Sequence, residues 1–165
     1  MCTDTNVKSQ VPGTGGDETF FGIRQNLEFG GLTLTTNITK QFDIPCGLTI
    51  GNMIALRGVF TAYTGFILNV QVDPNNYLLH FRPQNGFITL NYKRNAGWGT
   101  ASTANITSYP FQVGQQFLLN ILTRGDGLAM FVDGKLVATY PYIFPATSVR
   151  YLLLQATVQL LQLSI

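Results

Sequence analysis

The segment Phe131-Val132-Asp133-Gly134-Lys135-Leu136-Val137 gives the first indication of the fold. Its centre, Asp133-Gly134, lies between two apolar runs, and both residues tolerate the positive φ angles that a two-residue hairpin turn requires. The segment therefore predicts two antiparallel strands joined by a tight turn. Asn85-Gly86 carries the same signal and predicts a second hairpin.

Apolar runs of strand length continue through most of the chain on either side of these hairpins. They are rich in Val, Ile, Leu, Phe, Tyr and Thr, and turn residues separate them. No window has a convincing helical period beyond a turn or two. Many short antiparallel strands at even spacing predict an all-β sandwich or barrel. The predicted strands cover residues 32–35, 52–60, 66–72, 77–81, 87–92, 116–123, 128–132, 136–140, 150–156 and 158–165.

Composition limits the classes of protein to which the chain can belong. It has 165 residues, 11% of them charged, and a net charge of +2. So little charge argues against a nucleic-acid partner, which requires many Lys and Arg side chains to displace phosphate counterions. No uninterrupted apolar run approaches a membrane span. Residues 1–10 lack the apolar centre of a signal peptide, so we expect a cytoplasmic protein or one secreted without such a peptide.

Three regions are expected along the chain. Residues 1–19 are polar and Gly-rich and are interpreted as a flexible leader. Residues 20–41 are interpreted as an extension with an extra strand, and residues 42–165 as one β domain. Two cysteines, Cys2 and Cys46, are too few for a disulfide framework, so we expect two thiols, with a disulfide between them as the alternative.

An active site is not expected. His80 is the only histidine, and no Gly-x-Ser-x-Gly turn supplies a nucleophile for it. Asp73, Asp126 and Asp133 lie in predicted turns, where Asp is favoured for local backbone reasons. Phosphate-binding loops and metal-ligand spacings are absent from the sequence. We therefore predict that the protein is not an enzyme and has no cofactor or metal.

One stretch instead predicts a binding face. On a strand, His80, Arg82 and Gln84 share one face because side chains alternate. The Asn85-Gly86 turn then places Asn91 on the neighbouring strand. Trp98, the only tryptophan, lies between two glycines rather than in an apolar run. Such an indole suits stacking on the C–H face of a sugar while polar side chains fix the hydroxyls; the alternative is a Trp that caps the edge of the sandwich.

From about Phe42 to Ile165 the chain resembles the galectins, a family of jelly-roll β-sandwich lectins with two antiparallel sheets. The family pattern is His-x-Asn-x-Arg on one strand, Asn on the next, and then Trp-Gly-x-Glu-x-Arg. The positions that match, within and beyond this pattern, are His80, Phe81, Pro83, Asn91, Trp98, Gly99, the segment Tyr109-Pro110-Phe111, Gly114 and Phe117. The resemblance implies a glycan as the partner.

The departures from the family pattern concern the expected sugar contacts. Arg82 stands where the family has Asn, and Gln84 stands where it has Arg. After Trp98-Gly99, residues 100–103 supply neither the Glu nor the Arg. We therefore expect weak binding of simple β-galactosides and a preference for acidic, sialylated or sulfated glycans, with Arg82 as the anion contact.

Two other functions stay open at this point. One is a structural or protein-interaction module that has lost sugar binding, and the other is the receptor-attachment head of a viral surface protein, which would place it on a virion. Assembly is open as well. The apolar last strand, residues 158–165, invites pairing at its edge. Either the leader strand around Leu32 to Ile38 covers it, which we favour, or two subunits form a homodimer there.

Overall fold

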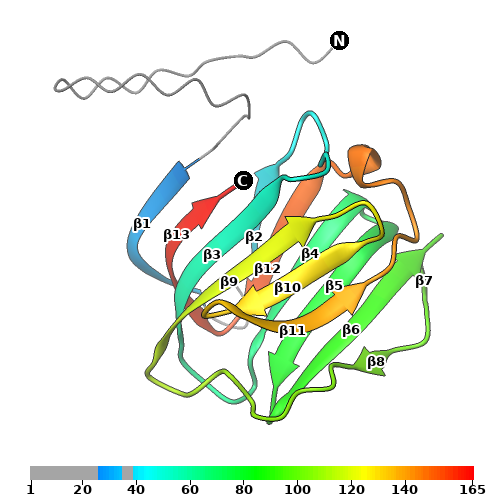
Figure 1. Cartoon of the computed structure of the whole chain (residues 1–165). Helices are drawn as coiled ribbons and strands as arrows, with labels where there is room; N and C mark the ends of the chain where they lie inside the picture. Colours follow the sequence, from blue (N-terminus) through cyan, green and yellow to red (C-terminus); the bar gives the residue numbers. More distant parts are fainter. Residues whose placement is uncertain (1–25, 35–38) are drawn as a thin grey trace, which may run out of the picture.

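The computed structural model describes residues 26–34 and 39–165 of the chain, so the expected leader at 1–19 lies outside the described residues. Two antiparallel sheets form a sandwich (Figure 1). The first has six strands in the spatial order β1 (Asn26–Leu34), β13 (Val158–Ser164), β3 (Met53–Phe60), β9 (Gln116–Thr123), β10 (Leu128–Val132) and β11 (Lys135–Tyr140).

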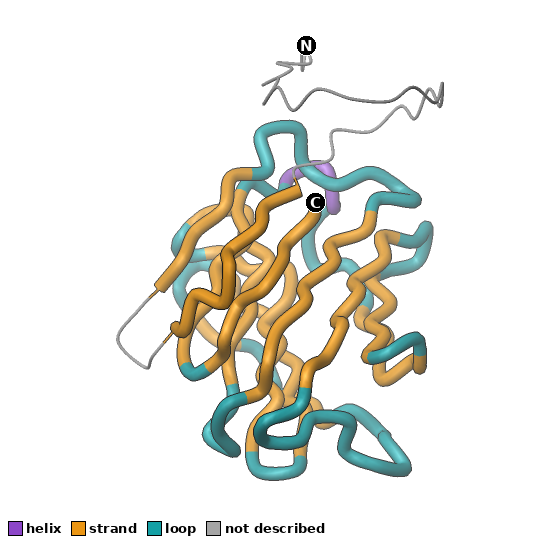
Figure 2. Tube along the Cα trace, turned by 90° about the vertical axis from the view of Figure 1, so that its left-hand side faces the viewer, coloured by secondary structure: helices purple, strands orange, loops and turns teal. Residues whose placement is uncertain are grey.

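The second sheet carries the residues expected to bind a ligand. Its seven strands are β2 (Thr39–Asp43), β12 (Tyr151–Ala156), β4 (Phe66–Asp73), β5 (Asn76–Gln84), β6 (Phe87–Arg94), β7 (Gly97–Trp98) and β8 (Ser102–Thr103). The first six follow one another in that order, and β8 pairs with β6. A 3-10 turn, η1 (Ala146–Ser148), precedes β12. Strands make up most of the described trace (Figure 2), so the all-β prediction is confirmed.

Both predicted hairpins have the expected backbone. Asn85 and Gly86 have φ angles of 48° and 86°, and Asp133 and Gly134 have 49° and 78°. These positive values match the left-handed conformation that the two-residue turns require. The first turn aligns β5 with β6 and thereby fixes which side chains of the two strands lie next to each other.

An aromatic cluster joins the two sheets. Phe66 of β4 and Phe117 of β9 stack with ring centroids 5.3 Å apart, and Phe111 packs edge-on against Phe117 at 5.1 Å. Phe81 of β5 lies 6.3 Å from Phe66 and is fully buried. Aromatic pairs of this kind contribute about 0.5–1.5 kcal/mol each beyond the area they bury. The buried Phe81 ring thus holds β5 against the core, and its chain neighbours on β5 face the other way.

An N-terminal strand, β1, covers the last strand, as predicted. β1 pairs antiparallel with β13, from Asn26 opposite Ser164 to Leu34 opposite Val158. The backbone edge of β13 that would otherwise be open to a second subunit is therefore occupied along this stretch. Residues 35–38, which the prediction also included, lie outside the described residues.

One cysteine differs from the expectation. Cys46 is disulfide-bonded, so the expected thiol at this position is wrong. At Cys46 the structure has the disulfide that was given above as the alternative. Separately, the described residues contain no helix of the length and apolarity needed to cross a bilayer.

Candidate functional site

The outer face of the seven-stranded sheet carries the predicted binding residues. Along β5, Leu79 and Phe81 are buried in the core, while His80, Arg82 and Gln84 alternate with them and are half-buried. Buried and half-buried side chains therefore alternate along this part of β5, and His80, Arg82 and Gln84 share one face as predicted. What they contact across the sheet depends on the register with β4 and β6.

His80 lies at the centre of a row of three polar side chains. Asn69 of β4 is opposite His80 on one side, and Asn91 of β6 is opposite it on the other. The Nδ1 atom of His80 is 2.7 Å from Oδ1 of Asn69, whose side chain is buried. Since an amide oxygen only accepts hydrogen bonds, Nδ1 carries the proton and donates it. Nε2 of His80 is left as an acceptor.

The imidazole of His80 is uncharged at neutral pH. Burial of the ring, and secondarily the positive charge of Arg82 on the same strand, lower the pKa of His80 to about 4. Both causes disfavour the imidazolium, because burial removes its hydration and the guanidinium repels it. His80 therefore serves as a fixed hydrogen-bonding group and does not titrate near pH 7.

Asn91 is oriented by its own backbone. Its Oδ1 accepts a hydrogen bond of 2.8 Å from the backbone N–H of Tyr92. This bond identifies the oxygen of the amide, so the NH₂ group is the part of the side chain that remains a donor. His80 and Asn91 thus bring an acceptor and a donor to adjacent positions in the row.

Trp98 is brought onto this row through pairing of β7 with β6. Lys93 is opposite Trp98 in the register, and the indole packs edge-on against the His80 ring with centroids 4.9 Å apart. The Tyr77 ring also packs edge-on against the indole, with centroids 5.6 Å apart. With these neighbours in place Trp98 is still 54% exposed, and it lies on β7 at the edge of the sheet.

Gly99 is required beside this tryptophan. A Cβ atom at position 99 would lie 2.1 Å from the Tyr92 ring, far closer than any real carbon contact. The backbone N–H of Gly99 also bonds to the carbonyl of Tyr92 at 3.0 Å. The glycine therefore lets β7 lie close to β6, which holds the indole over His80.

Arg82 occupies the next position along the face without a counter-charge. Its Nε atom is buried and has no hydrogen-bond partner among the described residues, and no ion pair forms to it there. Across the sheet it is opposite Thr89, which is opposite Thr103 of β8. The row beside the guanidinium thus offers hydroxyl groups where a carboxylate would be needed to neutralise it.

Gln84 lies at the far end of the face. It pairs with Phe87 across the Asn85-Gly86 turn, two residues beyond Arg82 on the same strand. The structure therefore brings His80, Asn91 and Trp98 together in one group, with Arg82 beside it and Gln84 at its margin.

Two residues of this face were not predicted. Asn69 positions His80, and the Lys93 ammonium lies 4.9 Å from the Tyr77 ring centroid and 5.8 Å from that of Trp98. Asn69 had a recognisable signal, since Asn69 and Gln71 interrupt the apolar run of β4 at alternate positions. Lys93 had none, because only the register with β7 brings it to Trp98.

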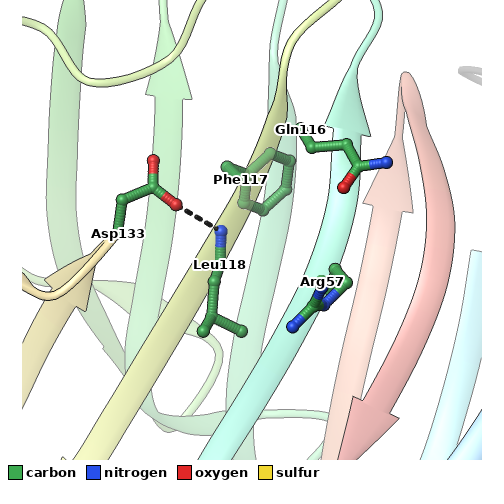
Figure 3. Close-up of a pocket in the computed structure, with 5 residues that line it drawn as sticks. All are labelled: Arg57, Gln116, Phe117, Leu118 and Asp133. Atoms are coloured by element: carbon green, nitrogen blue, oxygen red, sulfur yellow. Dashed lines mark hydrogen bonds between the residues drawn. The ribbon is translucent and has the colours of Figure 1, made fainter.

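A separate hollow of about 220 Å³ lies on the six-stranded sheet (Figure 3). Arg57 of β3 and Gln116, Phe117 and Leu118 of β9 line it together with Asp133. The Asp133 carboxylate accepts a 2.9 Å hydrogen bond from the Leu118 backbone N–H and so ties the β10–β11 turn to β9. None of the predicted binding residues lies in this hollow, and no three potential metal ligands cluster within 26–34 and 39–165.

Comparison with known proteins identifies relatives of the chain. The model of the galactoside-binding lectin family matches residues 39–165. Galectin-7 of Rattus norvegicus is 27% identical over 123 residues, which cover 71% of this chain and 89% of the rat protein.

Solved structures share the fold. Sheep galectin-11 in complex with glycerol superposes with a TM-score of 0.69 at 17% identity, over 76% of this chain and 96% of that one. Galectin LEC-6 of Caenorhabditis elegans gives a TM-score of 0.67 at 20% identity, over 79% and 91% of the two chains. The predicted jelly-roll sandwich is confirmed by these similarities.

Proposed function

The chain belongs to the galectin family, and from that premise we propose that it is a lectin module that prefers acidic glycans, sialylated or sulfated, to simple β-galactosides. The observation that carries the proposal is the uncompensated Arg82 guanidinium on the same strand face as His80, whose ring contacts Trp98. In this proposal Trp98 stacks on a sugar ring, His80 and Asn91 bond to its hydroxyls, and Arg82 meets the acid.

The charge of the face supports an anionic ligand. A guanidinium is a planar fork that matches a carboxylate or a sulfate, and such bonds are about twice as strong as neutral ones. Placing a neutral sugar on Arg82 would remove water from the charge without supplying a partner for it. The sequence has no Asp or Glu between Asp73 and Asp126, so this segment cannot supply the partner either.

Loss of the family's charged residues supports weak lactose binding. Gln84 replaces an Arg, and residues 100–103 contain neither the Glu nor the Arg of the family pattern. A hydrogen bond to a charged group is worth about 1.5–3 kcal/mol, so two or three losses reduce affinity by about 10³-fold or more. Lactose is therefore expected to bind far more weakly than in galectins that keep the full pattern.

A second function is supported by the same side chain. Arg82 is half-buried on the outer face, and its Nε is enclosed, so the guanidinium takes up space that a neutral sugar would need. On that basis the alternative is a galectin-fold protein-interaction domain without sugar binding.

Titration calorimetry separates the two functions. Lactose and sialyllactose are titrated into the wild type, Arg82→Asn and Trp98→Ala, with Arg57→Asn as a matched control that removes the same charge from the opposite sheet. We expect sialyllactose to bind the wild type and Arg57→Asn alike, to bind Arg82→Asn at least tenfold more weakly, and to be lost with Trp98→Ala. Binding to the wild type should also weaken with added salt, as partly exposed charge pairs do.

Two outcomes contradict the acidic-glycan proposal. Undiminished sialyllactose binding by Arg82→Asn would show that Arg82 is not the anion contact. Lactose binding that appears only in Arg82→Asn would show that the native arginine blocks the site, which is the result expected of the protein-interaction domain.

A further inference from the structure

Three successive residues, Arg124-Gly125-Asp126, are exposed in the turn that joins β9 to β10 (Figure 1). The residues on either side of them, Thr123 and Gly127, are buried. The two charged side chains are 47% and 75% exposed, and they form an ion pair in which Arg124 Nε lies 3.2 Å from Asp126 Oδ1. The turn belongs to the six-stranded sheet, so it lies apart from the residues proposed to bind a sugar.

Hydrogen bonds hold the backbone of this turn in place. The Arg124 N–H donates to the Gly127 carbonyl at 2.9 Å, and the Tyr142 hydroxyl donates to the Arg124 carbonyl at 2.5 Å. Just before the turn, the Thr123 N–H donates to the Asn52 carbonyl at 2.8 Å. A segment that is fixed in this way loses little conformational entropy when a partner binds it.

The fold requires one glycine of the turn and not the other. At Gly127 φ is +153°, and a Cβ atom would lie 2.3 Å from the Tyr140 carbonyl oxygen. Gly125 has no positive φ, and a Cβ there would meet only the Ile50 side chain, at an ordinary 3.9 Å. Nothing among the described residues therefore demands a glycine at position 125, whereas a partner that comes close to the backbone does.

Exposed apolar side chains lie beside the turn. Ile50, the neighbour of Gly125, is 74% exposed, and Met53, the first residue of β3, is 46% exposed. Met53 is opposite Leu122 of β9, two residues before Arg124. Protein interfaces combine an apolar centre with a polar rim and are enriched in Met and Arg. The end of the sandwich around this turn therefore has the composition of a surface that contacts another protein.

We propose that this surface, made of Ile50, Met53 and the Arg124-Gly125-Asp126 turn, docks on a receptor protein that presents a carboxylate and a bound divalent cation side by side. The receptor carboxylate accepts paired hydrogen bonds from the guanidinium, and the Asp126 carboxylate gives the cation an oxygen ligand. An exposed ion pair adds little to stability, so the receptor separates Arg124 from Asp126 at small cost. This docking does not depend on the proposed sugar binding.

Surface plasmon resonance on an immobilised integrin ectodomain tests the proposal, because integrins recognise the Arg-Gly-Asp tripeptide. The parent chain is compared with Asp126→Glu, Gly125→Ala and Asp43→Glu, each in Mg²⁺ and in EDTA. Asp43 is the matched control because it is an exposed carboxylate at the end of β2 in the other sheet. Every chain, the parent included, carries Trp98→Ala, so that glycans on the ectodomain do not retain it through the proposed sugar contact. Thermal unfolding checks that each variant is folded.

We expect the parent chain and Asp43→Glu to bind alike in Mg²⁺ and not in EDTA. Asp126→Glu and Gly125→Ala should bind at least about tenfold more weakly, as a central interface residue does when it is altered, with unchanged melting temperatures. Asp126→Glu keeps the charge and moves the carboxylate by one methylene, so its loss reports the geometry at the cation. Binding that persists in EDTA, or that is undiminished in Asp126→Glu, would overturn the proposal. So would absence of binding by the parent chain when a synthetic Arg-Gly-Asp peptide binds the same surface.

Discussion

Lowering the pH should destabilise the fold through His80, and the size of the effect follows from its environment. The pKa of His80 is lowered to about 4 in the folded protein, whereas an unfolded histidine titrates near about 6.5. Between these values the unfolded chain binds a proton that the folded chain does not. The free energy of unfolding therefore decreases as the pH falls from about 6.5 to about 4. At about 1.36 kcal/mol per pKa unit the loss reaches at most about 3 kcal/mol, and solvent contact at the half-buried ring reduces it.

Urea unfolding of the wild type and His80→Gln at pH 7, 5.5 and 4 measures this effect. The glutamine does not titrate, so the difference between the two pH dependences isolates the histidine from Asp73, whose pKa is also shifted. Because the chain has one tryptophan and one histidine, fluorescence follows unfolding and NMR follows the titration without overlap. The reasoning fails if both proteins lose the same stability between pH 7 and pH 4, or if His80 titrates near pH 6.5.

Two further predictions concern the scaffold. Gly65→Ala should lower the free energy of unfolding by about 3 kcal/mol or more, because φ is +71° there and the added Cβ would lie 1.6 Å from a backbone atom. The control Gly114→Ala, at φ +82° with open space around it, should cost about 1 kcal/mol. Denaturant unfolding compares the two variants, and equal losses would contradict the clash at Gly65. Deletion of residues 1–34, compared with the full chain and with both chains carrying Cys46→Ser, removes β1 from β13 and should lower the melting temperature or cause self-association. Calorimetry and sedimentation follow the two effects, and a monomer with an unchanged melting temperature would mean that β1 adds nothing to the sheet.

The sequence predicted the elements whose signals are local. The runs at 116–123 and 128–132 coincide with β9 and β10, and the Asn85-Gly86 turn was recognisable because its backbone requirement is met by two particular residues. β2, β7 and β8 were not predicted. They are short edge strands that form because a neighbouring strand offers a partner, and their own residues show little alternation.

Some features of the candidate site could likewise be predicted from local sequence, whereas others depend on how distant strands pair. His80, Arg82 and Gln84 could be placed on one face because the period of a strand is a local property. The contact of Trp98 with His80 and the position of Lys93 depend on the register of β6 with β7, which is set by the loop and by Gly99. The covering of β13 by a strand around residue 32 was predicted, because an apolar edge strand requires a partner, but the start of β1 at Asn26 was not.

The buried Asn69 determines which hydrogen-bond donors and acceptors the face can offer to a sugar. Because Asn69 accepts the proton of His80 Nδ1, the other ring nitrogen, Nε2, is a hydrogen-bond acceptor only. Asn91, whose oxygen accepts the Tyr92 N–H, presents its NH₂ group as a donor beside it. A ligand oxygen that bridges the two must therefore donate to one and accept from the other, which a hydroxyl does and a methyl ether does not. Discrimination between a free and a methylated sugar position would thus be set by a residue beneath the surface.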